Sequence, residues 1–167
     1  MKIKIKTESI SIIRALCLFD VEFVFVEPFF SYQHPTIQTY DAFIQRLAYL
    51  NGKAFYLTLN AYIEDDQLDA LKEKLSNYIQ LNPKGFYFAD FAVYQLLKEL
   101  DYQGELIYAP ETILTNSSDI SFYLNYVDRC LIAKELTLNE ILEISNKHAH
   151  KIELFALGYA LMSVSKR

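Results

Sequence analysis

About seven short apolar or alternating runs recur along the chain, and longer segments of helical periodicity lie between them. This repetition predicts βα units arranged around a parallel sheet. Several runs are continuous in Phe, Tyr, Val, Ile or Leu, as is typical of strands that are buried on both faces. The predicted strands are Ile3 to Lys6, Val21 to Val26, Lys53 to Leu59, Gly85 to Ala89, Glu105 to Ala109, Arg129 to Ala133 and Lys151 to Leu157.

Helices are expected between these strands. The clearest runs from Asp65 to Gln80, with an apolar stripe and acidic residues at its start. Thr137 and Glu140 have the spacing of a capping box and predict a second helix, which would turn Ile141, Leu142 and Ile144 inward. Asn116 is predicted to cap the start of another helix. Gly52, Gly85 and Gly104 each precede a predicted strand, where a left-handed residue often ends the preceding turn.

The spacing of the runs is compatible with a TIM-barrel-like (β/α) domain. We expect one domain over residues 1–167, although a complete eight-stranded barrel usually needs about 200–250 residues. Seven units cannot close such a barrel. An eighth unit would therefore lie beyond the C-terminus, or the sheet would stay open, or another copy or partner chain would complete it.

Composition limits the function classes. The net charge of -5 argues against a general nucleic-acid binder, although a local basic patch stays open. No window is long and apolar enough for a membrane span, and the N-terminus alternates Lys and Ile instead of showing a signal peptide. We therefore expect a cytoplasmic protein. Cys17 and Cys130 are its two cysteines, too few for a thiolate-built metal cage and most simply small buried hydrophobes.

Polar side chains follow several predicted strands, at the edge where parallel α/β sheets bind their substrates. They are Glu27, Asn60, Asp90, Glu111, Asn116 and Glu135, with Thr115 and Lys134 beside them. Converging carboxylates could hold a divalent cation, or one could act as a general base. Acidic residues near helix N-termini also complement the helix dipole, so a purely structural role is equally open for each residue alone.

Histidine and standard motifs add little. His148 and His150 precede the last predicted strand and so belong at the opposite edge, whereas His34 lies on the substrate side in the loop after the second strand. Motifs of serine hydrolases, zinc peptidases, dinucleotide-binding folds and phosphate-binding loops are absent from the sequence.

One segment in the second half of the chain, from Leu131 to Ile141, contains the run Lys-Glu-Leu-Thr-Leu-Asn-Glu-Ile. It resembles the Arg-Glu-Leu-(Ser/Thr)-Leu-x-Glu-Ile motif of peptidase family U32, the collagenase-like proteases, with Lys134 in place of the usual Arg. Further matches occur in order and extend from Asn60 to the C-terminus: Asn60, Ala89-Asp90, Thr115-Asn116 and the segment Glu153 to Gly158, which is similar to Glu-x-Phe-x-x-Gly.

The resemblance implies a barrel-like peptidase. Asp90, Glu111 and Glu135 would be its acid, base or metal-holding carboxylates, and Asn60 and Asn116 would orient substrate together with Lys134 and Glu153. With no nucleophile identified, attack by activated water is the mechanism left, and Glu135→Gln is expected to abolish turnover while preserving the fold.

The departures keep two other functions open. After Gly158 this chain has Tyr159, Ala160 and Leu161 where the family continues toward a cysteine, so the iron–sulfur cluster of some relatives is not expected within this chain. A relative of RNA-base or quinone hydroxylation factors is one alternative; it would bind RNA through Lys134, Lys166 and Arg167. The other alternative is a non-catalytic binding or assembly subunit with a degenerate barrel.

Overall fold

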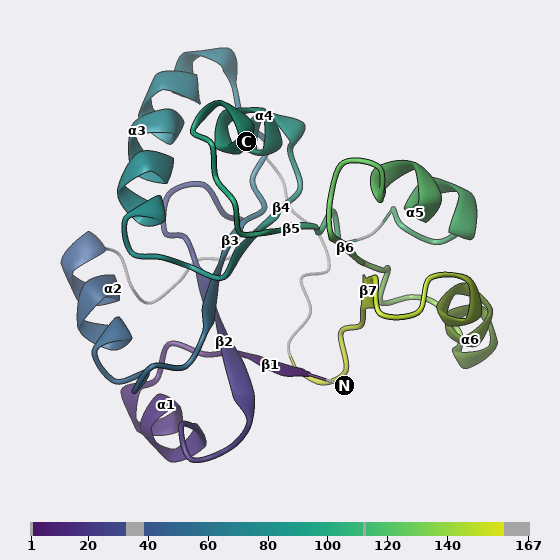
Figure 1. Ribbon diagram of the computed structural model, residues 1–167, viewed down its shortest axis with the longest axis horizontal. Helices are drawn as coiled ribbons and strands as arrows, with labels where there is room; N and C mark the ends of the chain where they lie inside the picture. Colours follow the sequence, from purple (N-terminus) through teal and green to yellow (C-terminus); the bar gives the residue numbers. More distant parts are fainter. Residues whose placement is uncertain (1, 33–38, 112, 159–167) are drawn as a thin grey trace.

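A computed structural model describes residues 2–32, 39–111 and 113–158. Its seven strands all run parallel and form one sheet in the order β1-β2-β3-β4-β5-β6-β7. The strands are β1 (Ile3–Lys6), β2 (Val21–Val26), β3 (Phe55–Leu59), β4 (Gly85–Phe88), β5 (Glu105–Tyr108), β6 (Arg129–Leu131) and β7 (Ile152–Glu153). The predicted fold class is confirmed: the sheet curls into an incomplete TIM-barrel-like half-barrel (Figure 1).

Helices alternate with the strands, as the βα pattern predicts. They are α1 (Ile10–Leu16), α2 (Tyr40–Leu47), α3 (Leu68–Ile79), α4 (Phe91–Glu99), α5 (Ser117–Tyr123) and α6 (Leu138–Lys147), with a short 3-10 turn η1 (Asp65–Gln67) before α3. The expected starts of two helices are confirmed: Thr137 and Glu140 form the capping box of α6, and Asn116 caps α5. None of the helices in the described ranges is long and apolar enough to cross a membrane.

The sheet separates two apolar layers of unequal size. Outward-facing strand residues such as Phe25, Leu57 and Phe88 pack with the helices in a large aromatic-rich core. A smaller cluster inside the curl joins Tyr56, Tyr87 and neighbouring aliphatic side chains. Because side chains alternate between the two faces, each strand contributes to both layers, which explains the continuous apolar runs.

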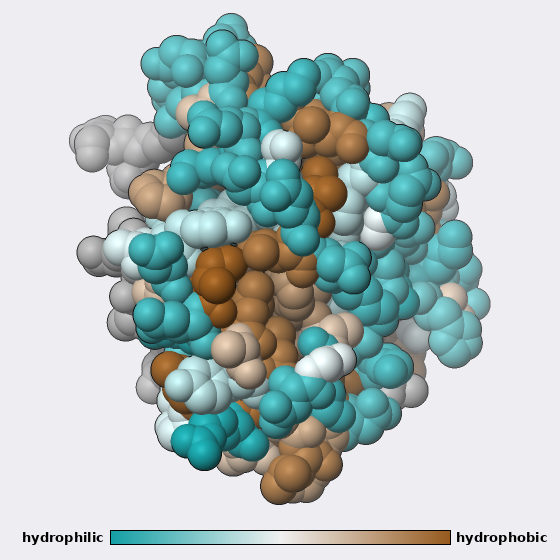
Figure 2. Space-filling view, turned by 60° about the vertical axis from the view of Figure 1, so that its left-hand side comes forward, coloured by the Kyte–Doolittle hydropathy of each residue, from teal (hydrophilic) through white to brown (hydrophobic). Residues whose placement is uncertain are grey.

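Cover on the outside of the sheet is incomplete in places. Figure 2, turned to bring forward the side of α2 and α3, shows a strip of apolar surface between polar borders. At the amino-terminal edge of the sheet, a groove is lined by Phe55, Ile79, Leu81, Pro83 and Tyr102 among others.

Several predicted details are wrong. The last strand is Ile152–Glu153 and not Lys151 to Leu157, because Phe155 and Leu157 are exposed side chains beyond the sheet. Leu142 points to solvent, since only Ile144 among the residues of α6 is fully buried.

Of the three glycines before strands, only Gly52 has a positive φ. Gly85 is needed for space instead, because a Cβ there would lie 2.5 Å from the Glu105 carbonyl oxygen. His34 and the segment 159–167, with Lys166 and Arg167, lie outside the described residues.

Candidate functional site at the strand ends

Asn60 is the centre of the polar cluster at the carboxyl edge of the sheet. It follows β3 directly and is buried. Its Nδ2 donates to Oε1 of Glu111 at 2.8 Å, and its Oδ1 accepts from the Ser31 hydroxyl and from the Tyr32 backbone N–H at 3.2 Å. The side chain thus joins the loop after β2 to the segment after β5. A buried amide with these partners has a fixed orientation.

Glu111 is the carboxylate that this cluster orients. It lies beyond β5 with a backbone φ of 68°, in the left-handed region that non-glycine residues rarely occupy. Such a conformation costs on the order of 1–3 kcal/mol and is common at functional sites. The side chain is half-buried, and its charge attracts the ammonium of Lys6 at the end of β1.

Lys6 adds a positive charge to the same edge. Desolvation lowers the pKa of its ammonium, and the attraction of the Glu111 carboxylate acts in the opposite direction. The Glu111 carboxylate thus bonds to an amide and attracts an ammonium. This is the combination that a water-activating site with a stabiliser of negative charge would use.

Glu27 supports the loop that carries Ser31 and Tyr32. This carboxylate is completely buried behind β2 and accepts from the backbone N–H groups of Phe29, at 2.6 Å, and Phe30, and from the Tyr78 hydroxyl at 2.7 Å. Burial raises its pKa, although the hydrogen bonds work against that rise. The hydrogen bonds of Glu27 therefore stabilise the conformation of this loop.

Two of the predicted site residues serve as helix caps. The Asp90 carboxylate accepts from the backbone N–H of Ala92 at the start of α4 and from that of Ile63, both at 2.9 Å. Asn116 accepts from the backbone N–H groups of Ser118 and Asp119 at 3.0 Å and is exposed. These bonds match the structural interpretation left open for polar residues near helix N-termini.

Three other predicted residues lie at different depths. Glu135 is an exposed residue whose carboxylate is 3.9 Å from Nζ of Lys134, itself largely covered. Glu153 faces the interior of the half-barrel, where it bonds Lys4 Nζ at 2.6 Å and the Tyr87 hydroxyl at 2.5 Å. Among the predicted site residues in the described ranges, Glu111 is the one to which Asn60 bonds directly.

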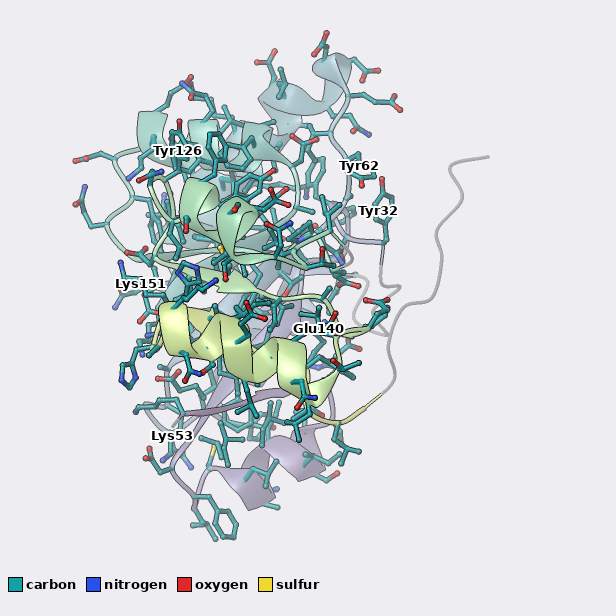
Figure 3. All side chains as sticks on the ribbon, turned by 90° about the vertical axis from the view of Figure 1, so that its right-hand side faces the viewer. Tyr32, Lys53, Tyr62, Tyr126, Glu140 and Lys151 are labelled. Atoms are coloured by element: carbon teal, nitrogen blue, oxygen red, sulfur yellow. The ribbon has the colours of Figure 1, made fainter. Side chains whose placement is uncertain are left out.

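An aromatic pair borders the cluster. The rings of Tyr32 and Tyr62 meet edge to face with centroids 5.7 Å apart, and the Tyr32 hydroxyl accepts from the Tyr62 backbone N–H at 3.0 Å. Figure 3 shows both rings together at the rim of the molecule, at the edge opposite Lys53 and Lys151. Tyr62 is exposed.

Sequence reasoning missed Lys6, Ser31 and Tyr32. The loop after β2 carries no motif, and Lys6 was predicted only as the last residue of an alternating strand. The one available signal was that Lys6 lies two residues after Lys4 and so faces the same side of the strand; Lys4 is largely covered inside the half-barrel, where a lysine needs a partner.

The chain does not fit an iron–sulfur cluster by itself. Such clusters are held by about four cysteine thiolates. Cys17 and Cys130 are both buried, and burial raises the pKa of Cys130 to about 12, far from a thiolate ligand. Among the described residues, no group of three or more His, Cys, Asp or Glu side chains is placed to hold a metal ion.

Comparison with known proteins decides the family. The sequence pattern of peptidase family U32 matches residues 37–167, most of the chain. The chain belongs to peptidase family U32. The resemblance seen in the second half of the sequence is thus confirmed, and the match also includes α2 and β3.

Curated relatives in the family have two kinds of name. An uncharacterised protease of Methanocaldococcus jannaschii is 29% identical over 116 residues, 68% of this chain and 28% of the relative. The tRNA hydroxylation protein P2 of Bacillus subtilis is 27% identical over 122 residues, 72% of this chain and 40% of the relative.

The tRNA hydroxylation protein P of Helicobacter pylori is 28% identical over 134 residues, 79% of this chain and 32% of the relative. The chain thus spans well under half of the length of each of these relatives. No solved structure matches it.

Proposed function

We propose that this half-barrel hydrolyses peptides, with the Glu111 carboxylate as the general base that activates water. The observation that carries this proposal is the 2.8 Å bond from Asn60 to Glu111 at the carboxyl edge of a parallel sheet, in a chain of a peptidase family. The amide orients one oxygen of Glu111, and a carboxylate held in this way can accept a proton from a water molecule bound beside it.

The remaining groups take supporting roles. Attack by water on a peptide carbonyl develops negative charge on the carbonyl oxygen, and the Lys6 ammonium is the nearby cation that would stabilise it. Protonated Glu111 would then pass its proton to the leaving amine. Lys134 and Glu135 would contact substrate at the rim, while Asp90, Asn116 and Glu153 would act indirectly through the helices and the interior.

A comparison of two Gln variants tests this assignment. Glu111→Gln keeps the volume and the contact with Asn60 but removes the base, so turnover of a quenched fluorescent peptide library is expected to fall by about 100-fold or more. Sequence alone led us to expect that Glu135→Gln would abolish turnover. Because the Glu135 carboxylate is exposed at the rim, we now propose that this variant weakens substrate binding at most and retains most turnover at saturating peptide, so it serves as the rim comparison. Loss of turnover only in Glu135→Gln would transfer the role of base to Glu135 and reject the proposal. Running each assay with EDTA and with added Mg²⁺, Mn²⁺ or Zn²⁺ determines whether a divalent cation takes part.

Participation in RNA hydroxylation is the second candidate function. Relatives named tRNA hydroxylation proteins motivate it, and the Tyr32–Tyr62 pair offers an exposed ring of the kind on which unpaired bases stack. Retention of tRNA on the immobilised chain that weakens steeply with salt, and weakens about tenfold in Tyr62→Ala, would support this function. Equal retention by wild type and Tyr62→Ala would count against it.

A further inference from the structure

Glu27 lies at the point where the chain leaves the sheet. Its backbone N–H donates to the Thr58 carbonyl oxygen at 3.0 Å, one residue beyond β2, and Pro28 follows. Proline has no backbone N–H with which to extend the ladder. The next two donors, the backbone N–H groups of Phe29 and Phe30, bond to the buried Glu27 carboxylate instead. The first turn of the loop after β2 is therefore built on one side chain.

The partners of the Glu27 carboxylate are neutral donors. Besides the two backbone groups, the Tyr78 hydroxyl of α3 donates to Oε1 at 2.7 Å, and Tyr78 is itself buried. Burial raises the pKa of Glu27 despite these bonds, so its surroundings favour a neutral side chain. The loop thus depends on the acceptor atoms of Glu27 and not on its charge.

The same loop is bonded to the residues that follow β3. The Ala61 backbone N–H donates to the Phe30 carbonyl oxygen at 3.1 Å. Asn60 Oδ1 accepts from the Ser31 hydroxyl and from the Tyr32 backbone N–H, the latter at 3.2 Å. Three consecutive loop residues therefore contact two consecutive residues at the end of β3. A shift of the loop would be transmitted to the Asn60 side chain.

The loop also determines which way the Asn60 amide faces. Oδ1 accepts hydrogen bonds and Nδ2 donates them, so a half-turn of the amide exchanges an acceptor for a donor. The Tyr32 backbone N–H can only donate, and it therefore selects Oδ1 on the side of the loop. Nδ2 then faces Glu111, to whose Oε1 it donates at 2.8 Å. In the reversed orientation Oδ1 would meet the Glu111 carboxylate, and two acceptors would repel each other.

We infer that Glu27 is a positioning residue for the proposed base: it holds the loop after β2, the loop orients the Asn60 amide, and the amide orients Glu111. The inference rests on the proposed peptidase function. Glu27 acts only through these intermediate groups. An indirect role of this kind matters for the rate, because a misplacement of about 1 Å at a reacting group can cost on the order of 100-fold.

Two variants of Glu27 separate acceptor geometry from charge. Glu27→Gln retains an oxygen for the two backbone N–H groups, and its Nε2 can donate to the Tyr78 hydroxyl, which then accepts. Glu27→Met has a similar volume but offers only a weak thioether acceptor. Glu22→Met is the matched control, because Glu22 is also a buried carboxylate of β2, but it lies at the opposite end of the strand, where it bonds Lys84 Nζ at 2.7 Å.

Nitrogen-15 NMR of the Asn60 side chain tests the inference without any peptide. The Nδ2 signals are assigned by their absence in Asn60→Ser, and the exchange of their protons with water is measured in each variant. Glu27→Met is expected to speed this exchange by about tenfold, whereas Glu27→Gln and Glu22→Met keep the wild-type rate. Unchanged exchange in Glu27→Met, or equal acceleration in Glu22→Met, would overturn the inference.

Urea unfolding establishes that each variant is folded. If Glu27→Met does not fold, Tyr78→Phe takes its place, because it removes only one of the three bonds to the carboxylate. A smaller acceleration of Asn60 exchange is then expected, and no acceleration would overturn the inference.

Turnover of the peptide library tests the same link in the reaction. Glu27→Met is expected to lower kcat by about tenfold and to leave KM within about twofold, since Glu27 does not contact substrate. In an Asn60→Ala background the same substitution should lower kcat no further, because the link to Glu111 is already broken. Equal losses in the two backgrounds would show that Glu27 acts by another route and would overturn the inference.

The two readouts separate this inference from the proposed function. Faster Asn60 exchange in Glu27→Met, without hydrolysis by the wild type, would leave the link from Glu27 to Asn60 standing and reject the peptidase. Hydrolysis that requires Glu111, with both kcat and Asn60 exchange unchanged in Glu27→Met, would do the reverse.

Discussion

Glu153→Gln removes the charge that links the last strand to the first. In the folded protein this carboxylate accepts from Lys4 Nζ and from the Tyr87 hydroxyl, and it lies 3.5 Å from the Arg129 guanidinium. The side chains of Lys4 and Glu153 are only 10% and 15% exposed, so water cannot replace the lost partner. Breaking a buried pair by removing one charge typically costs about 3–5 kcal/mol, and the retained amide oxygen lowers that cost. We expect a loss of about 2–4 kcal/mol in the free energy of unfolding.

Urea unfolding of a double-mutant cycle measures the effect. Lys4→Met is expected to cost a similar amount, because it leaves the Glu153 charge without this partner, and the double variant should cost clearly less than the sum. The exposed pair of Lys72 and Glu99 is the matched control, since its atoms are 2.9 Å apart but the side chains are 47% and 44% exposed. The same substitutions there should change stability by no more than the error of the measurement. Equal effects at the two pairs would refute the reasoning from burial.

Three further predictions follow from single contacts. Gly85→Ala is expected to destabilise the protein by about 1–3 kcal/mol in thermal unfolding, because the new Cβ would lie 2.5 Å from the Glu105 carbonyl oxygen and 2.9 Å from the Tyr56 ring. The pKa of Glu27 is higher in the folded than in the unfolded chain, so the folded state holds this proton more tightly. Stability is therefore expected to fall as pH rises from about 4.5 through the raised pKa, and Glu27→Gln should flatten that part of the urea-derived stability profile. Cys130 should resist iodoacetamide at about pH 8 until urea unfolds the chain, as followed by intact mass; rapid native labelling would contradict its burial.

Strand order was predictable from sequence, but strand length was not. Parallel neighbours in chain order follow from the alternation of short apolar runs and helices. The predicted ends were too late for several strands, since Ala89 and Ala109 continue the apolar run one residue beyond the ladder. At β7 the error is larger, because apolar residues such as Phe155 and Leu157 lie beside an edge with no covering helix in the described residues. Hydrophobicity shows that a residue favours burial, but it does not show whether the fold provides a place to bury it.

The candidate site was predictable only where one rule sufficed. The rule that parallel strands gather polar residues at their carboxyl ends found Asn60 and Glu111. It could not separate these residues from Asp90 and Asn116, because a helix cap and a substrate ligand use the same residue types at the same place. Glu153 was assigned by resemblance to the family, whereas its inward direction depends on strand register, which sequence alone does not specify.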